Sequence, residues 1–277
     1  MNIKVLILSF NHPEITKDCV LSAKSFFRDE EIFLVHNGSE TKHIANVQKA
    51  YPNIHHLIIE TNQGYTGGTN FGLKHIFAIP TDWILFLTND CLLKKMDRDE
   101  FINKQTSSFI APKITLRKTD YVGSWGGEFN ASNGQLRHLK TSTGTTNMFY
   151  VHGAAFAIHR DFWKQNGDFD ESLHSYWEDV DYSMRAHKKG LLLKQSPDIE
   201  IAHKVGKTTQ GNSFYTTFLF QRNRIIISRR FLKMQNSHYI RPVFEIRIKL
   251  QLIRLIFLNI RRAKIKEINY LIKLLLK

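Results

Sequence analysis

Short apolar runs alternate with segments of helical periodicity along the first part of the chain. Four of these runs have the length of strands and are rich in β-branched and aromatic residues, at 3–8, 32–35, 54–59 and 83–87. Helical segments near 14–27, 42–51 and 69–77 separate them. Strands joined by helices pair in parallel through right-handed crossovers. The pattern therefore predicts an open Rossmann-like α/β sheet.

The rhythm changes after residue 114. Segments 123–127 and 130–134 are rich in turn residues, and 141–146 is small and polar, which is typical of a loop. A strand at 151–158, a short helix at 161–166 and a turn at 167–171 follow. A second helix then runs to about Gly190, where glycine favours a helix end. Two short strands are predicted at 191–194 and 199–202, and the pattern is helical from Phe214 onwards.

The composition separates the two ends of the chain. With 42% hydrophobic and 23% charged residues, the 277-residue chain is an ordinary globular protein with room for a large core. Between Arg222 and Lys277, however, fifteen Lys and Arg residues accompany only two acidic residues, so this segment carries +13 of the total formal charge of +14. We therefore expect a nearly neutral body at 1–223 and a basic amphipathic helical tail at 224–277.

The tail combines basic residues with an apolar stripe at three-and-four spacing. Its charge-free stretches, such as 255–260, are far shorter than the roughly 20 residues needed to span a bilayer. Such a helix suits an anionic membrane surface. The alternatives are a helix packed on the body and a helix that binds nucleic acid. Because no base-reading module is recognisable, we expect no nucleic-acid partner.

The cysteines and the N-terminal run bear on location. Cys19 and Cys91 provide neither a disulfide framework nor metal-ligand spacing, which indicates a reducing compartment. The first apolar run is too short for a signal peptide and lacks a cleavage site. We therefore expect a cytoplasmic protein, held peripherally on the inner face of the cell membrane by its tail.

Acidic residues at two places in the predicted fold indicate a functional site. Glu178, Asp179 and Asp181 lie among aromatic residues at the start of a predicted helix, and Asp90 follows the strand at 83–87. Crowded carboxylates are costly to remove from water unless a cation or a substrate compensates. Ligands of α/β sheets bind at strand ends. The plain alternative for the helix is a set of acids favoured by its dipole. Both points together suggest a metal-assisted transfer site.

Five stretches in a fixed order carry a family resemblance: Leu8-Ser-Phe-Asn11, Val35-His-Asn-Gly-Ser39, Asn62-Gln-Gly-Tyr-Thr-Gly-Gly-Thr-Asn-Phe-Gly72, Thr88-Asn-Asp90 and the segment 167–185. Together they resemble the inverting nucleotide-sugar glycosyltransferases of glycosyltransferase family 2, from Lys4 to about Asn223. The chain looks most similar to the rhamnosyl- and galactofuranosyl-transferase branch. The resemblance implies the GT-A fold, a Rossmann-like mixed sheet flanked by helices.

The resemblance also implies an activity. The enzyme would move a hexosyl or deoxyhexosyl group from a nucleoside-diphosphate-sugar to a glycan or lipid-linked acceptor, with inversion, in cell-surface polysaccharide or lipopolysaccharide synthesis. Thr88 stands where relatives carry the first acid of a D-x-D-like metal motif. This departure keeps open a nucleotidyltransferase-like or inactive relative. A nucleic-acid-binding protein that uses the basic tail is the alternative from another class.

By resemblance, the donor is held by strand ends and by the glycine-rich loop. Glycines allow backbone to approach a ligand, and a helix N-terminus suits phosphate. At position 36 relatives usually have Asp, which accepts a hydrogen bond from the nucleotide base, and a neutral imidazole can also accept one. Arg222 would contact the diphosphate, although a structural ion pair is the alternative. The expected donor-binding residues are Ser9, Asn11, His36, Asn37, Asn62, Gly64, Gly67, Asn70, Asn89 and Arg222.

The remaining roles also come from the resemblance. Asp90 and His203 match the ligands of a divalent metal, Mg or Mn, and a single carboxylate with phosphate and water oxygens can hold Mg²⁺. Asp179 matches the catalytic base that takes the proton of the acceptor hydroxyl. We expect its neighbours to contact the acceptor, while a core role for the indole and a capping role for the acids stay open. These neighbours are Trp177, Glu178 and Asp181.

Overall fold

The computed structural model describes residues 2–98, 101, 107–116, 121–142, 144–203, 214–231, 250 and 253. The chain divides into two compact units. The first comprises Met1–Phe129 and Leu136–Thr208, and the second comprises Asn130–Gln135 and Thr209–Lys277. Each unit is described by itself.

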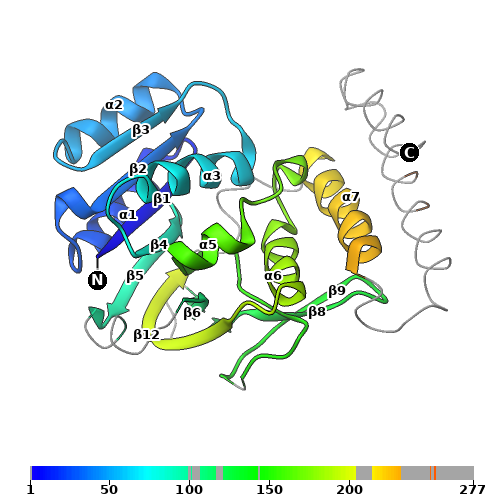
Figure 1. The fold of residues 1–277 in the computed structure, drawn as a ribbon. Coiled ribbons are helices and arrows are strands. Elements are labelled where there is room, and N and C mark those ends of the chain that lie inside the picture. Colours follow the sequence, from blue (N-terminus) through cyan, green and yellow to red (C-terminus); the bar gives the residue numbers. More distant parts are fainter. Residues whose placement is uncertain are drawn as a thin grey trace. The chain divides into compact units, whose positions relative to one another are not determined.

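The first unit begins with the predicted parallel half-sheet (Figure 1). Its strands are β1 (Ile3–Ser9), β2 (Ile32–Asn37), β3 (His55–Ile59) and β4 (Trp83–Thr88), paired in the order β3-β2-β1-β4. The connecting helices are α1 (Pro13–Lys24), α2 (Thr41–Ala50) and α3 (Gly64–Phe77), with a 3₁₀ turn, η1 (Asp29–Glu31), before β2. All three pairings are parallel. The βαβ prediction is therefore confirmed.

The same sheet continues as a mixed sheet beyond β4. Its further strands are β11 (Ala155–His159), β6 (Phe109–Leu116), β12 (Leu193–His203) and β5 (Cys91–Met96), in this order, and β7 (Val122–Ser124) pairs with β6. β11 runs antiparallel to β4, and β12 is parallel to β6 but antiparallel to β5. Among the described residues this sheet has nine strands.

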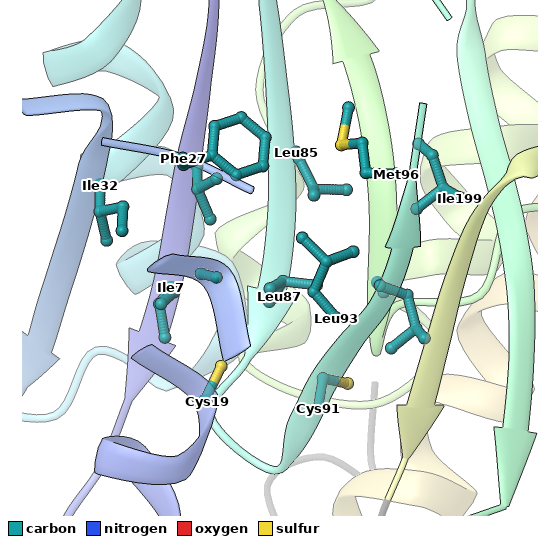
Figure 2. Packing of buried hydrophobic residues seen from close by; sticks show 14 of the residues in the cluster. Ile7, Cys19, Phe27, Ile32, Leu85, Leu87, Cys91, Leu93, Met96 and Ile199 are labelled. Atoms are coloured by element: carbon teal, nitrogen blue, oxygen red, sulfur yellow. The ribbon is translucent and has the colours of Figure 1, made fainter. Parts of the chain in front are cut away.

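Helices cover both faces of the sheet, because its strands are apolar on both sides. Along β1, Ile3, Val5 and Ile7 belong to one buried cluster and Leu6 and Leu8 to another. The first cluster receives residues of α1 and α2 and includes the side chains of Figure 2, among them Cys19 and Leu87. The second receives residues of α3, α5 (Arg160–Asn166) and α6 (Glu178–Lys188).

The remaining elements are short. A small sheet has the order β10-β8-β9, from Phe149–Tyr150, Gly127–Asn130 and Gln135–His138, and a 3₁₀ turn, η2 (Glu171–Leu173), precedes α6. In the second unit, α7 covers Phe214–Phe231, and Arg224 donates a hydrogen bond to the Asn133 carbonyl. None of the described helices combines the length and apolar character needed to cross a bilayer.

Several predicted boundaries differ from the structure. The two strands expected at 191–194 and 199–202 are one strand, β12, whose register shifts between Ser196 and Glu200. In the strand expected at 151–158, residues 151–154 form a connection and β11 begins at Ala155. Helix α3 begins at Gly64 rather than Thr69. The amphipathic segment of the basic tail lies outside the described residues, except for Leu250 and Ile253.

Candidate active site

Asp90 and His203 come together because two strands end at the same place. Asp90 follows β4, and His203 is the last residue of β12, where it pairs with Cys91 of β5. Asp90 Oδ2 and His203 Nε2 lie 3.4 Å apart. Asp90 is buried, and Thr88 Oγ1 donates to its other oxygen at 2.7 Å. Thus Thr88, which replaces the expected acid, orients the acid that is present.

Asp90 and His203 fit a divalent metal. An oxygen and a nitrogen bound to one ion at about 2.1 Å lie roughly 3.0–3.4 Å apart for ordinary ligand angles. The Cys91 sulfur lies within 4.8 Å of both partner atoms. However, burial and then the Asp90 charge raise the pKa of this thiol, and Sγ donates to the Ala154 carbonyl at 3.3 Å. Because this hydrogen bond already engages the thiol, we take the carboxylate and the imidazole as the candidate metal centre.

Asp179 lies in the first turn of α6, as its sequence position predicts. Its carboxylate oxygens accept backbone hydrogen bonds from Gly153 N at 2.9 Å and from Val180 N at 2.8 Å. Burial raises the pKa of Asp179 to about 6, although both hydrogen bonds oppose the shift. Desolvation, rather than repulsion by the neighbouring acids, is thus the dominant cause of the raised pKa.

Glu178 and Asp179 are neighbours, but they differ in their hydrogen bonds. Burial, and then the charge of Asp179, raise the pKa of Glu178 well above its usual value. Glu178 Oε2 is buried and has no hydrogen-bond partner among the described residues. Two backbone N–H groups from Gly153 and Val180 stabilise an ionised Asp179 instead. We infer that the negative charge of the pair resides on Asp179 while Glu178 stays protonated.

The connection between β10 and β11 joins the two acidic points. Gly153 N contacts Asp179, and the next carbonyl, that of Ala154, accepts hydrogen bonds from Thr88 N and from Cys91 Sγ. The ring of His152 lies 6.2 Å from the ring of His203. Asp90, Asp179 and His203 are therefore gathered around one three-residue segment, residues 152–154.

His152 is the site residue that the sequence reasoning missed. It stands inside a run of small and apolar residues that predicts only a strand, at 151–158. The signal that could have identified it is a polar ring near the start of this otherwise apolar run. Burial and the neighbouring histidines lower the pKa of His152 to about 3, so the ring is neutral near pH 7.

At the end of β2, hydrogen bonds fix the tautomer of His36. His56 Nε2 lies 2.9 Å from the Tyr51 carbonyl, which can only accept, so this nitrogen carries the proton. His56 Nδ1 then accepts from His36 Nε2 at 3.0 Å. Burial, and then His56, lower the pKa of His36 to about 4. Neutral His36 therefore retains Nδ1 as an acceptor, as a base-contacting residue would require.

Asn37 and Asn62 hold the start of α3 against the end of β2. Asn37 accepts from Gln63 N at 3.0 Å and donates to the Gly64 carbonyl at 2.8 Å. Asn62 Oδ1 accepts from Gly64 N at 2.8 Å. A Cβ on Gly64, whose φ is 73°, would lie 2.4 Å from His174 Nδ1. This position thus requires glycine for both conformation and space.

The other glycines of the predicted donor loop lie inside α3. A Cβ on Gly67 would meet Gln63 at 2.7 Å, and one on Gly68 would meet Leu8 at 2.6 Å. Asn70 is buried, donates to the Phe169 carbonyl and accepts from Phe169 N, both at 2.9 Å. These contacts dock α3 closely on its neighbours, and the expected donor contacts of Gly67 and Asn70 stay predictions.

Ser9, Asn11 and Asn89 also hold local structure together. Asn89 donates to Thr16 Oγ1 at 3.0 Å, and that hydroxyl lies 2.8 Å from Ser9 Oγ, all in buried surroundings. Asn11, at a φ of 53°, accepts from Glu40 N at 3.0 Å. These bonds fix the ends of β1 and β4, and the donor contacts expected for the three residues stay predictions.

The remaining predicted residues occupy buried positions. Trp177 is 3% exposed and packs edge-on against Phe129. Asp181 is fully buried and accepts from Arg185 Nε at 2.8 Å, one helical turn away. Arg222 is buried in the second unit, where its Nε donates to the Asn223 side chain at 2.8 Å. The acceptor and diphosphate roles expected for them stay predictions.

The turn before α6 has an unusual backbone. His174, Tyr176 and Trp177 have φ values of 62°, 71° and 71°. Left-handed backbone costs bulky residues about 1–2 kcal/mol each, so the surrounding packing must hold this turn in place. The strain lies directly before Glu178 and Asp179, where such outliers support a functional interpretation.

A relative by sequence is named a hexosyltransferase. The hexosyltransferase Agl10 of low-salt glycan biosynthesis from Haloferax volcanii is 26% identical over 194 residues, which cover 65% of this chain and 61% of Agl10. The chain therefore spans less than two thirds of that relative.

Two solved structures share the fold. Mannosyltransferase PcManGT from Pyrobaculum calidifontis, in complex with GDP-Man and Mn²⁺, has a TM-score of 0.54 and 13% identity, over 98% of this chain and 79% of that one. TarS 1–349 of S. aureus, in complex with UDP-GlcNAc, has a TM-score of 0.55 and 16% identity, over 99% and 79%. The likeness shows the fold alone and confirms the predicted GT-A class.

The sequence model of Glycosyl transferase family 2 matches residues 4–166. This range contains β1 to β4, the glycine-rich segment Asn62–Gly72 and Asp90, and it covers more than half of the chain. The chain therefore belongs to glycosyltransferase family 2.

Proposed function

We propose that this glycosyltransferase moves one sugar from a nucleoside-diphosphate-sugar to a glycan or lipid-linked acceptor with inversion. The observation that carries the proposal is the gathering of Asp90, His203 and Asp179 around residues 152–154. A metal-binding pair beside a partly buried carboxylate provides one group for the leaving diphosphate and one for the attacking hydroxyl.

The relatives support this choice of substrates. Agl10 is named a hexosyltransferase of glycan biosynthesis, and the two structural neighbours hold GDP-Man with Mn²⁺ and UDP-GlcNAc. By analogy, the donor here is a nucleoside-diphosphate-sugar and the cofactor is Mg²⁺ or Mn²⁺. The transferred group is a hexosyl or deoxyhexosyl unit of the rhamnosyl- and galactofuranosyl-transferase kind, for cell-surface polysaccharide or lipopolysaccharide.

Asp90 and His203 would hold the metal. A bound divalent cation neutralises the charge that develops on a leaving diphosphate. Thr88, by donating to one Asp90 oxygen, leaves the other oxygen directed towards His203. The donor set is one carboxylate and one imidazole, so phosphate and water oxygens complete it.

Asp179 would act as the base. Its pKa of about 6 keeps the carboxylate ionised near pH 7, yet basic enough to take a proton from an attacking hydroxyl. The hydrogen bonds from Gly153 and Val180 fix its orientation. Protonated Glu178 is available to donate a hydrogen bond to the acceptor sugar. A single displacement assisted by one base inverts the anomeric centre.

The tautomer of His36 bears on the nucleotide base. In the neutral ring its Nδ1 can accept a hydrogen bond, whereas a protonated imidazolium would only donate. Uracil and guanine present a ring N–H, and adenine and cytosine present unprotonated ring nitrogens at the corresponding edge. We therefore expect the enzyme to bind UDP or GDP in preference to ADP and CDP.

Two further proposals concern organisation. We propose that 1–223 forms the transferase domain and that 224–277 binds the inner face of the cell membrane, because the tail carries nearly all of the net charge. Flotation of the full chain with anionic vesicles, against a gel-shift assay with duplex DNA and with RNA at matched salt, tests the tail. Binding to nucleic acid alone would replace the membrane proposal.

The central experiment uses Asp179→Asn. Wild-type protein with Mg²⁺ or Mn²⁺, radiolabelled UDP- and GDP-sugars and a lipid extract containing lipid-linked acceptors should transfer label to the lipid phase. The variant should lose about 10²–10⁴-fold in rate, as expected for a lost general base. UDP and GDP binding, measured separately, should persist. Asp161→Asn, at an exposed acid in the first turn of α5, is the matched control. Transfer that survives in Asp179→Asn would remove the base role.

A further inference from the structure

His152 lies at the centre of the candidate site but has no role in the proposed reaction. It precedes Gly153, whose N–H binds Asp179, and its ring is close to two other histidine rings. The ring centroid of His152 is 5.1 Å from that of His138 and 6.2 Å from that of His203. His203 in turn contacts Asp90. The imidazole of His152 is therefore beside the candidate metal centre, on the segment that carries the contact to the base.

The structure determines which nitrogen of His152 carries the proton. Ala154 N lies 3.1 Å from His152 Nδ1, and a backbone N–H can only donate. Nδ1 therefore uses its lone pair on this bond. In a neutral imidazole the proton must then be on Nε2. A protonated Nε2 has no lone pair for a metal, so His152 is not a third ligand beside Asp90 and His203.

The Nε2–H group of His152 has no partner in the part of the chain that the structure describes. The ring is half-buried, and its described interactions are the bond at Nδ1 and the two neighbouring rings. Asp90, the nearby carboxylate, already faces Thr88 with one oxygen and His203 with the other. A neutral donor held rigidly beside a metal centre suits an anionic oxygen from a ligand.

We propose that His152 Nε2–H donates a hydrogen bond to a phosphate oxygen of the bound nucleoside diphosphate. The inference rests on the proposed function, which puts the diphosphate at the Asp90–His203 pair. His152 would thereby add a directional contact to a centre in which Thr88 has replaced a metal-ligating acid. It is a binding residue for the leaving group, and its Nδ1 bond to Ala154 fixes the ring.

Two substitutions separate donation from a merely structural role. In His152→Asn, the side-chain oxygen replaces Nδ1 and can keep the Ala154 bond, but no donor reaches the position of Nε2. In His152→Gln, the amide nitrogen reaches the position of Nε2, while the Ala154 bond is lost. Donation predicts that Asn weakens binding of UDP or GDP with Mg²⁺ by about 10–100-fold and that Gln largely restores it. A structural role predicts the opposite order.

Isothermal titration of UDP and of GDP with Mg²⁺ into the full-length protein measures both variants, and a thermal melt confirms that each is folded. Binding by His152→Asn equal to wild type would overturn this inference alone. A wild-type protein that binds neither nucleotide would overturn the proposed function and this inference together. Imidazole ¹⁵N spectra add a direct readout. They should show His152 protonated at Nε2, with a shift of that proton signal on adding the nucleotide, and a spectrum unchanged by bound nucleotide would refute the contact.

Discussion

Replacing the proposed base should remove a penalty on the stability of the folded protein that grows as the pH rises towards neutral. Burial raises the pKa of Asp179 from 3.8 to about 6, so the folded state holds a proton that the unfolded chain releases between these values. A carboxyl whose pKa is raised on folding favours the folded state at low pH and disfavours it as the pH rises through the folded pKa. Asp179→Asn removes this titration.

The magnitude follows from the shift. About two pKa units, at about 1.4 kcal/mol each, correspond to a penalty of about 3 kcal/mol in wild type at pH 7, which is absent below about pH 4. The asparagine keeps one oxygen for Gly153 N or Val180 N and leaves the other N–H without its acceptor, which costs about 1–3 kcal/mol at every pH. The quantity to measure is therefore how the difference in unfolding free energy between Asp179→Asn and wild type changes with pH.

The assay is urea unfolding of wild type and Asp179→Asn in EDTA at several values between pH 4 and 7.5. Relative to wild type, the variant should gain about 3 kcal/mol in unfolding free energy across this range, mostly between pH 4 and 6.5. Asp161→Asn, at an exposed position, should show no comparable trend. A stability difference for Asp179→Asn that is the same at pH 4 and pH 7 would refute the assignment of a raised pKa to this carboxyl.

Three further predictions concern other parts of the site. His56→Phe keeps a ring against His36 but removes the nitrogen that accepts a hydrogen bond from His36 Nε2–H. The unfolding free energy should therefore fall by about 1–3 kcal/mol, and UDP or GDP should bind more weakly. Calorimetry that shows neither effect would contradict the assignment of the proton to His36 Nε2. Gly68→Ala puts a methyl group 2.6 Å from Leu8, which should cost about 1–3 kcal/mol in denaturant unfolding, and a neutral result would mean that α3 can move away from β1. Mn²⁺ at 100 times its dissociation constant should raise the unfolding free energy of wild type by about 2.7 kcal/mol in thermal melts, and Asp90→Asn should lose this stabilisation. Equal stabilisation of both proteins would mean that the ion does not bind at Asp90.

The parallel half of the fold is readable from sequence because its signals are local. Four apolar runs separated by helical segments predict β1 to β4, and the structure confirms their pairing. β5 was missed for a physical reason. Lys94 and Lys95 are exposed in the middle of this strand, so Cys91–Met96 shows no regular alternation. β5 is an edge strand of the sheet, and an edge strand can carry exposed polar side chains.

The sequence predicts the positions of some residues of the candidate site, but not their protonation states or the position of His152. Asp90, Asp179 and His203 were identified from motifs, and the meeting of β4, β5 and β12 explains why Asp90 and His203 are in contact. The role of Glu178 as a protonated partner depends on burial, which no local pattern encodes. The tautomers of His36 and His152 depend on backbone atoms of distant or neighbouring residues, and only coordinates supply these.

The left-handed turn before α6 is a point of local frustration. Three non-glycine residues adopt a conformation that each would avoid in isolation, and only the folded surroundings oppose their relaxation. Local unfolding starts in the segment whose opening costs the least free energy, and opening the turn at His174–Trp177 would release its backbone strain. We therefore expect this turn to open before the rest of α6. In hydrogen exchange, the amides of the first turn of α6 should therefore exchange through a smaller opening than those near Met184. Glu178 and Asp179, whose geometry matters for the proposed reaction, thus follow directly after the strained turn.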